Sequence, residues 1–380
     1  MKKTKSIVSI LMVLALLFSL CACTQQQTSR LEPTAVEIPT QKATEPVDKA
    51  TSLLNSMTLE EKVGQMFFVR CPDVDAAETV SRYHLGGLIL FGRDFEGKTA
   101  DEIRSNISSY QSAAKLGLLI GVDEEGGTVV RVSDNPNLRS EAFPSPKNAY
   151  QNGGWEEVEQ TETEKAELLT SLGINANMAP VCDVTSNEES FIYDRSFSGD
   201  AEQVSEFVKK TVGIYNGHKL GAVIKHFPGY GDNTDTHEDM AYDSKPYSDF
   251  QQTDFLPFKA GIAAGAGAVM VAHNIVECMD SEAPASLSPK VHQILRNELG
   301  FEGVILTDDL VMEAIQKYTG ADAAAVAAAK CGNDMLLCSD VETQYPAVLA
   351  AAQSGAITEE QLNASVKRIL QWKINLGLIK

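Results

Sequence analysis

The sequence predicts an α/β protein whose folded part is a (β/α)8 barrel of the TIM type. From about Thr51 onward, short apolar runs alternate with amphipathic stretches of helical length. Apolar runs that alternate with helices indicate a parallel sheet with both faces covered. Eight such units fit a closed barrel, and a doubly wound open sheet is the alternative. The predicted strands are Phe67–Arg70, Gly87–Phe91, Leu118–Val122, Ala176–Val181, Ala222–Lys225, Ala268–Ala272, Val304–Thr307 and Met335–Cys338.

The stretches between these strands have the spacing of apolar residues that is typical of helices packed on a sheet. The last predicted helix, Thr358–Leu376, lies near the carboxyl terminus, and we expect residues 50–380 to form one domain. The other predicted helices are Asp101–Ala114, Val158–Leu172, Ala201–Gly217, Phe255–Ala266 and Leu287–Leu299.

Residues 1–22 are predicted to be a lipoprotein signal peptide. Three lysines precede an apolar run over residues 10–18, which is too short to span a bilayer comfortably and fits the core of an export signal. The run leads to Leu-Cys-Ala-Cys at residues 20–23, which resembles the cleavage site of bacterial lipoproteins. We therefore expect lipidation of Cys23 and an extracytoplasmic protein that is lipid-anchored to the cell membrane. An ordinary cleavable signal is the alternative.

Residues 23–49 are predicted to be a disordered tether. They are rich in Gln, Thr, Pro and Glu and have almost no periodic pattern of apolar residues. Such a segment after a lipid-bearing cysteine would hold the folded domain away from the membrane.

The composition narrows the classes of ligand. The chain of 380 residues has 52 acidic and 32 basic side chains, a net charge of −20. An acidic surface repels phosphates, so we expect no nucleic acid partner and favour a small or neutral polymeric ligand. The five cysteines after Cys23 are scattered, which argues against a disulfide framework, and Cys182 and Cys338 are predicted to be small core residues. No spacing suggests zinc, and we expect no metal and no cofactor.

Polar residues stand at the ends of six predicted strands. The carboxyl ends of all strands in such a barrel converge on one mouth. Six polar ends therefore indicate a functional site, whereas a single one would have no such weight. They are Arg70, Asp123, Asp183, the pair Lys225 and His226, His273 and Asp308.

Three segments carry most of this polar character. Residues 121–127 place three acids beside two glycines, and such carboxylates can accept hydrogen bonds from ligand hydroxyl groups, although a solvated loop is the alternative. Residues 225–237 begin with a Lys-His pair and end with Asp-X-His in a loop rich in Pro and Gly. In residues 303–310, strand alternation directs Asp308 into the mouth, and Asp309 is expected to cap the following helix.

Together these segments resemble family 3 of the glycoside hydrolases, and within it the β-N-acetylglucosaminidase branch. The resemblance covers nearly all of residues 50–380, and its most specific part is Lys-His-Phe-Pro-Gly at 225–229 followed by Asp-X-His at 235–237. The sequence departs from the family pattern at Tyr230, where a His is usual, and at Glu124, where a Gln is common. Other matching segments are residues 86–91, 177–183, 195–197, 270–273 and 368–370.

The resemblance implies roles for individual residues. Asp308 matches the nucleophile of the family, and Asp235 with His237 matches its acid/base dyad. A further set matches the residues that hold the terminal sugar: Asp123, Arg131, Arg195, Lys225 and His226.

On this resemblance, the barrel is a single catalytic domain, and the protein is a retaining exo-β-N-acetylglucosaminidase that works through a glycosyl-enzyme intermediate. A GlcNAc-terminated glycan is the expected substrate, and a muropeptide from peptidoglycan is the form that an extracytoplasmic lipoprotein would meet. The alternatives are a β-glucosidase or another exo-glycosidase of the same family, phosphorolysis in place of hydrolysis, and a sugar-binding lipoprotein without catalysis. The sequence leaves the oligomeric state open.

Overall fold

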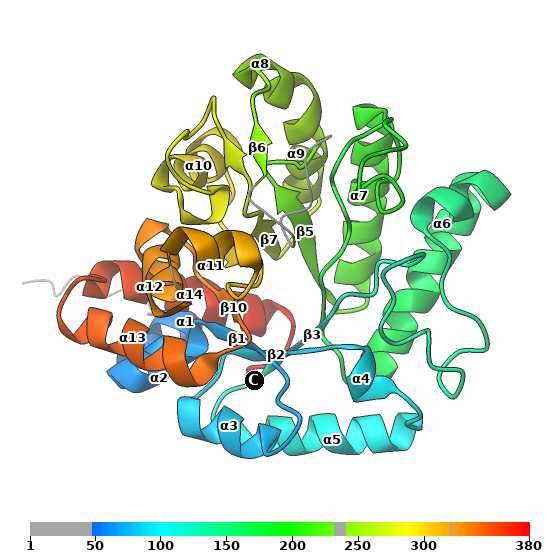
Figure 1. The fold of residues 1–380 in the computed structure, drawn as a ribbon. Coiled ribbons are helices and arrows are strands. Elements are labelled where there is room, and N and C mark those ends of the chain that lie inside the picture. Colours follow the sequence, from blue (N-terminus) through cyan, green and yellow to red (C-terminus); the bar gives the residue numbers. More distant parts are fainter. Residues whose placement is uncertain (1–47, 232–240, 320) are drawn as a thin grey trace, which may run out of the picture. The chain divides into compact units, whose positions relative to one another are not determined.

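Eight parallel strands stand at the centre of the structure, with helices around them (Figure 1). It is a computed structural model that describes residues 48–231, 241–319 and 321–380, all of which belong to one unit, Val47–Lys380. The predicted signal peptide and Cys23 lie outside the described residues. The central strands are β1 (Phe67–Arg70), β2 (Gly87–Leu90), β3 (Leu119–Val122), β4 (Ala176–Asn177), β5 (Gly221–Phe227), β7 (Ala268–Val271), β9 (Val304–Thr307) and β10 (Leu336–Cys338).

The strands follow one another around the sheet in chain order. β10 pairs with β1, and the order continues through β2, β3, β4, β5 and β7 to β9, always in parallel. A parallel bridge between Leu306 and Met335 then joins β9 to the residues that enter β10, so the sheet closes. The predicted (β/α)8 barrel is confirmed, and the open-sheet alternative is wrong.

β4 is shorter than predicted. The predicted strand ran to Val181, whereas regular pairing stops at Asn177. Pro180 has no N–H to donate to a neighbouring strand, so the ladder is interrupted there. Pairing resumes where Val181 bridges to Lys225 in β5, and β5 itself continues to Phe227, two residues beyond its predicted end.

From residue 48 onward, two helices precede β1, and the first begins at Lys49, the last residue of the predicted tether. A short pair of strands outside the barrel, β6 (Tyr242–Asp243) and β8 (Ile275–Val276), completes the strands described. None of the helices in the described segments has both the length and the apolar character that crossing a bilayer requires. The α-helices are α1 (Lys49–Ser56), α2 (Leu59–Gln65), α3 (Ala76–Tyr83), α4 (Gly92–Phe95), α5 (Ala100–Ala113), α6 (Pro146–Ser171), α7 (Ala201–Gly217), α8 (Tyr247–Asp249), α9 (Phe255–Ala263), α10 (Pro289–Gln293), α11 (Glu313–Thr319), α12 (Ala321–Cys331), α13 (Val341–Gln353) and α14 (Glu359–Asn375).

Helix α6 begins earlier than the predicted start at Val158. The hydroxyl of Ser145 accepts a hydrogen bond from the N–H of Asn148, and a proline follows at the first helical position, a combination that starts helices well. Gly154 then has a φ of 67°, and the helix kinks there. Because the kink breaks the periodic pattern of apolar residues, the sequence did not predict the first part of the helix. The predicted helix Leu287–Leu299 is likewise divided, into α10 and a π-helical turn, Ile294–Glu298.

The interior of the barrel is filled by side chains that need glycines as neighbours. Phe68 is fully buried, and a Cβ atom added at Gly87 of β2 or at Gly121 of β3 would lie 2.4 Å from its ring. These two glycines therefore provide the space that the Phe68 ring occupies. Cys182 and Cys338 are buried in the core as predicted, and all five cysteines after Cys23 are free in the structure.

At the amino-terminal end of β1, the fully buried side chain of Lys373 on α14 meets Gln65 of α2. Its Nζ donates to Oε1 of Gln65 at 2.7 Å, and the amide of Gln65 donates in turn to the carbonyl of His84. Burial disfavours the charged ammonium and lowers the pKa of Lys373 to about 7. The unfolded chain keeps this proton up to about pH 10.5, the ordinary value for lysine.

We therefore expect part of the stability of the domain to depend on pH through Lys373. Between about pH 7 and pH 10.5 the unfolded state binds more protons than the folded state, so the free energy of unfolding rises with pH, by up to about 1.4 kcal/mol per pH unit. Lys373→Met removes this dependence, and its stability advantage over the natural chain should shrink between pH 7 and pH 9.5 in urea unfolding. Lys330→Met, at an exposed position of α12, is the control. A difference that is constant with pH contradicts the prediction.

Candidate active site

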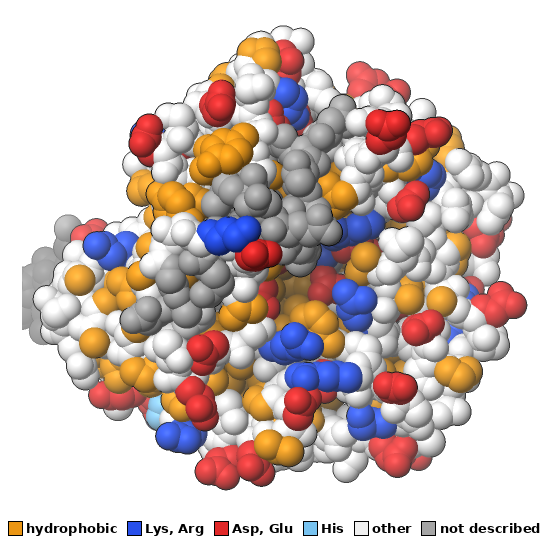
Figure 2. Space-filling view, viewed as in Figure 1, with side chains coloured by type: hydrophobic (Ala, Val, Ile, Leu, Met, Phe, Trp, Pro, Cys, Tyr) orange, Lys and Arg blue, Asp and Glu red, His pale blue; other side chains and the backbone are white. Residues whose placement is uncertain are grey.

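The carboxyl ends of the barrel strands surround a cavity of about 560 Å³. Figure 2 shows a hollow on this face of the molecule, with acidic and basic side chains gathered around it. Several of the lining residues stand at or just beyond strand ends, among them Arg70 in β1, Asp123 after β3 and Asp308 after β9. The structure thus brings together six of the predicted site residues in one cavity: Asp123, Arg131, Arg195, Lys225, His226 and Asp308.

Four charged side chains form the most buried part of this cavity. The Nζ atom of Lys225 lies 2.6 Å from Oδ1 of Asp123 and 2.6 Å from Oε1 of Glu125. Arg195 binds the same Glu125 with two hydrogen bonds, of 2.9 Å from Nε and 2.8 Å from Nη2. We call Asp123, Glu125, Arg195 and Lys225 the charge cluster. Glu125 belongs to the acidic segment identified in the sequence, but it was not predicted to be a site residue.

The charge cluster keeps Glu125, Arg195 and Lys225 ionised. Burial raises the pKa of Glu125, but the positive charges of Arg195 and Lys225 outweigh burial and hold that pKa well below its ordinary value. For Lys225, burial lowers the pKa, and the carboxylates of Asp123 and Glu125 outweigh it, so the pKa is raised. The cavity therefore presents fixed charges that can donate to and accept from the hydroxyl groups of a ligand.

His226 is held in one orientation beside the charge cluster. Its Nδ1 lies 2.7 Å from Oδ2 of Asp183, and the N–H of Tyr230 donates to the other oxygen of Asp183 at 2.8 Å. A carboxylate only accepts, so Nδ1 carries a proton, and Nε2 accepts from Nη2 of Arg195 at 3.1 Å. Tyr230, which replaces the histidine usual in the family, is buried with its ring edge-on to His226.

The three adjacent acids after β3 divide between two purposes. Asp123 and Glu125 belong to the charge cluster, whereas the carboxylate of the fully buried Glu124 accepts from the N–H groups of Arg131 and Val132, each at 2.7 Å. The carboxylate of Glu124 is therefore engaged by the backbone of the loop that follows it. Its hydrogen bonds with the backbone are already made, and they position Arg131.

Two arginines and a phenylalanine form another wall of the cavity. The guanidinium of Arg70 lies 4.6 Å from the ring centre of Phe91, and that of Arg131 lies 5.8 Å from the same ring. The Nε of Arg131 is buried and has no hydrogen-bond partner among the described residues. An N–H in this position can donate to a ligand without giving up a bond within the protein. Arg70 and Phe91 were not predicted to be site residues, although Arg70 was noted as a polar strand end.

Asp308 lies on the opposite side of the barrel, in the turn after β9. Its N–H donates to the carbonyl of Val271 in β7 at 3.2 Å, and its Oδ1 accepts from the N–H of Asp309 at 2.8 Å. The carboxylate of Asp309 accepts from the hydroxyl of Ser339 at 2.6 Å and from the N–H of Val311 at 3.2 Å. Asp309 therefore stabilises its own turn and does not cap helix α11, which begins at Glu313. Burial raises the pKa of Asp309.

Asp235 and His237, the predicted acid/base dyad, lie outside the described residues. The described chain leaves β5 through Gly231 and resumes at Ala241, and both of these residues are buried. Within the described segments, no three His, Cys, Asp or Glu side chains are arranged to hold a metal ion.

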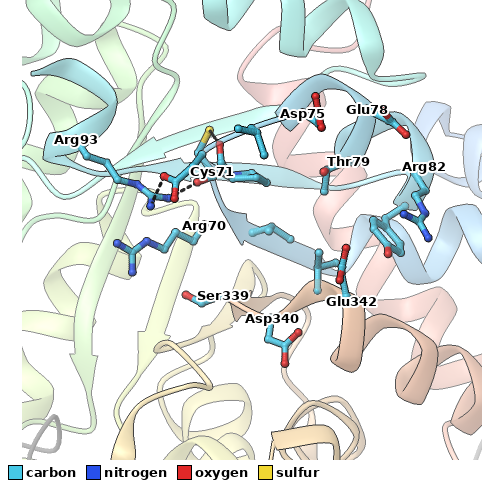
Figure 3. Close-up of a pocket in the computed structure, with 16 residues that line it drawn as sticks. Arg70, Cys71, Asp75, Glu78, Thr79, Arg82, Arg93, Ser339, Asp340 and Glu342 are labelled. Atoms are coloured by element: carbon cyan, nitrogen blue, oxygen red, sulfur yellow. Dashed lines mark hydrogen bonds and ion pairs between the residues drawn. The ribbon is translucent and has the colours of Figure 1, made fainter.

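A second cavity, of about 620 Å³, lies over the ends of β1 and β10 and shares Arg70 with the first (Figure 3). Arg93 forms an ion pair with Asp73 at its edge, and the carboxylate of Asp73 is 72% exposed. The smaller cavity, in contrast, has charged groups that are buried and paired in a fixed geometry. Burying charges is costly unless their position serves a purpose, so the smaller cavity is the stronger candidate for the active site.

Comparisons with known proteins agree with this geometry. The model of the glycosyl hydrolase family 3 N terminal domain matches residues 58–372. The beta-hexosaminidase of Nitrosomonas eutropha is 34% identical over 267 residues, which cover 68% of this chain and 75% of that protein.

Comparison with solved structures also finds proteins of this family. The family 3 beta-N-acetylglucosaminidase from Paenibacillus sp. superposes with a TM-score of 0.80 at 32% identity, over 85% of this chain. This chain spans 63% of the length of that structure. The beta-N-acetylhexosaminidase from Beutenbergia cavernae superposes with a TM-score of 0.75 at 27% identity, over 83% of this chain and 98% of the other. Since the family model matches most of the chain and the barrel superposes on family members, the chain belongs to glycosyl hydrolase family 3 and is a glycoside hydrolase.

Proposed function

We propose that this glycoside hydrolase is a retaining exo-β-N-acetylglucosaminidase that removes terminal β-linked GlcNAc. The observation that carries the proposal is that Asp308 and the charge cluster line the same cavity from opposite sides of the barrel. A sugar bound to the cluster would present its anomeric carbon to a carboxylate. The names of the relatives support the choice of sugar, since the Nitrosomonas protein is a beta-hexosaminidase and the Paenibacillus structure a beta-N-acetylglucosaminidase.

The charge cluster suits the hydroxyl groups of a terminal sugar. Charged donors and acceptors that are already paired and oriented lose little on binding, and they form stronger hydrogen bonds than neutral groups do. We assign this binding role to Asp123, Arg131, Arg195, Lys225 and His226. Glu125 holds Arg195 and Lys225 in place, so its role is to support the residues that bind.

The proposed reaction has two displacements at the anomeric carbon. In the first, a carboxylate oxygen of Asp308 bonds to that carbon while its bond to the leaving oxygen breaks and His237 transfers a proton to that oxygen. In the second, His237 takes a proton from water, the water oxygen bonds to the anomeric carbon, and the ester to Asp308 breaks. Asp235 orients His237 and stabilises its protonated form.

We further propose that the substrate is a peptidoglycan fragment and that the protein is anchored outside the cytoplasmic membrane through Cys23. The support is the sequence of residues 1–23, which resembles a lipoprotein signal, followed by a segment suited to a tether. Stable attachment needs at least two lipid chains, because one chain binds a membrane only marginally. Cell fractionation tests the anchor: Cys23→Ala should leave the protein in the medium or unprocessed, and normal cleavage with retention in the membrane would contradict it.

A panel of nitrophenyl sugars tests the specificity of the domain. We expect kcat/KM for the β-GlcNAc substrate to exceed that for the β-glucoside by roughly 100-fold or more, because a site that binds the acetamido group leaves polar groups unpaired with glucose. Equal values for the two sugars would favour a β-glucosidase of the same family. Tight binding of sugars without turnover would indicate a binding protein, and faster turnover with inorganic phosphate would indicate phosphorolysis.

Asp308→Ala should abolish nearly all turnover, by about four orders of magnitude or more, because the variant cannot form the covalent intermediate. The thermal unfolding temperature should change little, since the substitution removes no core packing. Asp73→Ala, at the exposed edge of the second cavity, is the matched control and should keep full activity. Mass spectrometry of the natural chain after reaction with an activated fluorosugar should place the adduct on Asp308, and an adduct on Asp309 would overturn the assignment.

The role of His237 is tested through the leaving group. A general acid matters most when the departing oxygen is a poor leaving group, so His237→Ala should slow a chitooligosaccharide by roughly 100-fold or more and an activated dinitrophenyl glycoside far less. Asp235→Asn should act on the same steps with a smaller effect. His218→Ala, at the far end of the barrel, is the control. Equal slowing of both substrates would show that His237 is not the acid.

A further inference from the structure

A chain of buried polar side chains lies behind the turn that carries Asp308. His273 follows β7 by two residues, and Asp309 follows β9 by two residues, so the pairing of Val271 with Thr307 places them side by side. Nε2 of His273 lies 3.1 Å from the carbonyl oxygen of Asp309, and Nδ1 lies 2.7 Å from the hydroxyl of Ser286. His273 and Ser286 are fully buried.

The partners of His273 indicate which ring nitrogen donates a hydrogen bond. A carbonyl oxygen can only accept, so Nε2 of His273 carries a proton and donates it to Asp309. If His273 is neutral, Nδ1 accepts from the hydroxyl of Ser286, and both ring nitrogens are engaged. Ser286 is itself fixed, because its N–H donates to the carbonyl of Ala272 at 2.9 Å and its carbonyl accepts from Nδ2 of Asn333 at 2.7 Å.

This series of hydrogen bonds ends at Asp309, whose N–H orients the proposed nucleophile. The N–H of Asp309 donates to Oδ1 of Asp308, and its carboxylate accepts from Ser339 after β10. The carbonyl of Asp309 accepts from His273 and, within the turn, from the N–H of Met312 at 3.0 Å. Asp309 is thus fixed from both neighbouring strands. A rotation of its backbone would move the N–H away from the carboxylate of Asp308.

We propose that His273, fixed by Ser286, is a positioning residue that holds the Asp308–Asp309 turn so that the carboxylate of Asp308 faces the anomeric carbon. The inference rests on the proposed function, which makes Asp308 the nucleophile. His273 does not belong to the lining of the cavity and is fully buried, so it acts through Asp309 and not by contact with the sugar.

The chain contains a matched control for this residue. His292 is also buried and lies in the same region, beside Cys331, but its Nδ1 contacts the carbonyl of Ser288 at 2.8 Å. Within the described segments, no hydrogen bond links His292 to the turn after β9. Truncation of His292 leaves a space of the same size as truncation of His273. A difference between the two variants therefore reports on the contact with Asp309 and not on the loss of a buried ring.

The test compares His273→Ala, His273→Gln and His292→Ala in the full chain. A displacement of about 1 Å at a reacting group costs roughly 100-fold, so we expect kcat of His273→Ala to fall by about 10- to 100-fold with KM nearly unchanged. The loss should be similar for activated and unactivated leaving groups, because it concerns the nucleophile. The rate of covalent trapping by an activated fluorosugar should fall in parallel. His273→Gln, which keeps a donor near Nε2, should recover part of the rate, and His292→Ala should keep it.

Several outcomes would overturn the inference. A folded His273→Ala variant with normal kcat and trapping rate would do so, as would a loss confined to KM or an equal loss in His292→Ala. If His273→Ala does not fold, Ser286→Ala provides the same test with a smaller change, since it removes only the acceptor bond of His273. Failure of the proposed function is recognised separately, because then Asp308→Ala itself remains active or the fluorosugar labels another residue.

Discussion

The pairing of Lys225 with two carboxylates is the interaction on which the rest of the site depends. Its ammonium is fully buried and shared between Asp123 and Glu125, and Glu125 in turn binds Arg195 with both oxygens. A buried charge without a partner costs several kcal/mol, so each member requires the others to be in place. Because the members come from β5, the turn after β3 and the connection after β4, the cluster also fixes three segments of the barrel mouth relative to one another.

The cavity therefore has two halves with different constructions. On the side of β3 to β5, ionised side chains hold one another, and the field that a ligand meets exists before it binds. On the side of β7 to β10, Asp308 contacts the backbone of two neighbouring residues, the N–H of Asp309 and the carbonyl of Val271. The residues proposed to bind the sugar and the proposed nucleophile thus have separate supports within the closed ring of strands.

The sequence predicted the bounds of helices and strands better than it predicted the contacts between side chains. The bounds of β1 and β9 were predicted to the residue, because a polar side chain ends each apolar run. The length of β4 was overestimated, because a run of apolar residues does not reveal that Pro180 interrupts the pairing of strands. Alternation along the chain could not tell which of Glu124 and Glu125 turns to the backbone and which to Arg195. His273 was noted as a polar strand end, but its contact with Asp309 depends on the register of β7 and β9. The roles of Asp235 and His237 stay predictions.

Two buried lysines show where the fold keeps charge. Lys373, at the amino-terminal end of the barrel, has the amide of Gln65 as its one side-chain partner among the described residues, and burial lowers its pKa to about 7. Lys225, at the mouth, is equally buried, but its two carboxylates raise its pKa. A buried lysine can thus lose its proton near neutral pH at one end of the barrel, while another buried lysine keeps its proton at the opposite end. Paired buried charges rarely stabilise a fold more than apolar residues would, so the charge kept at the mouth is best explained by ligand binding. This argument for the site does not depend on similarity to known proteins.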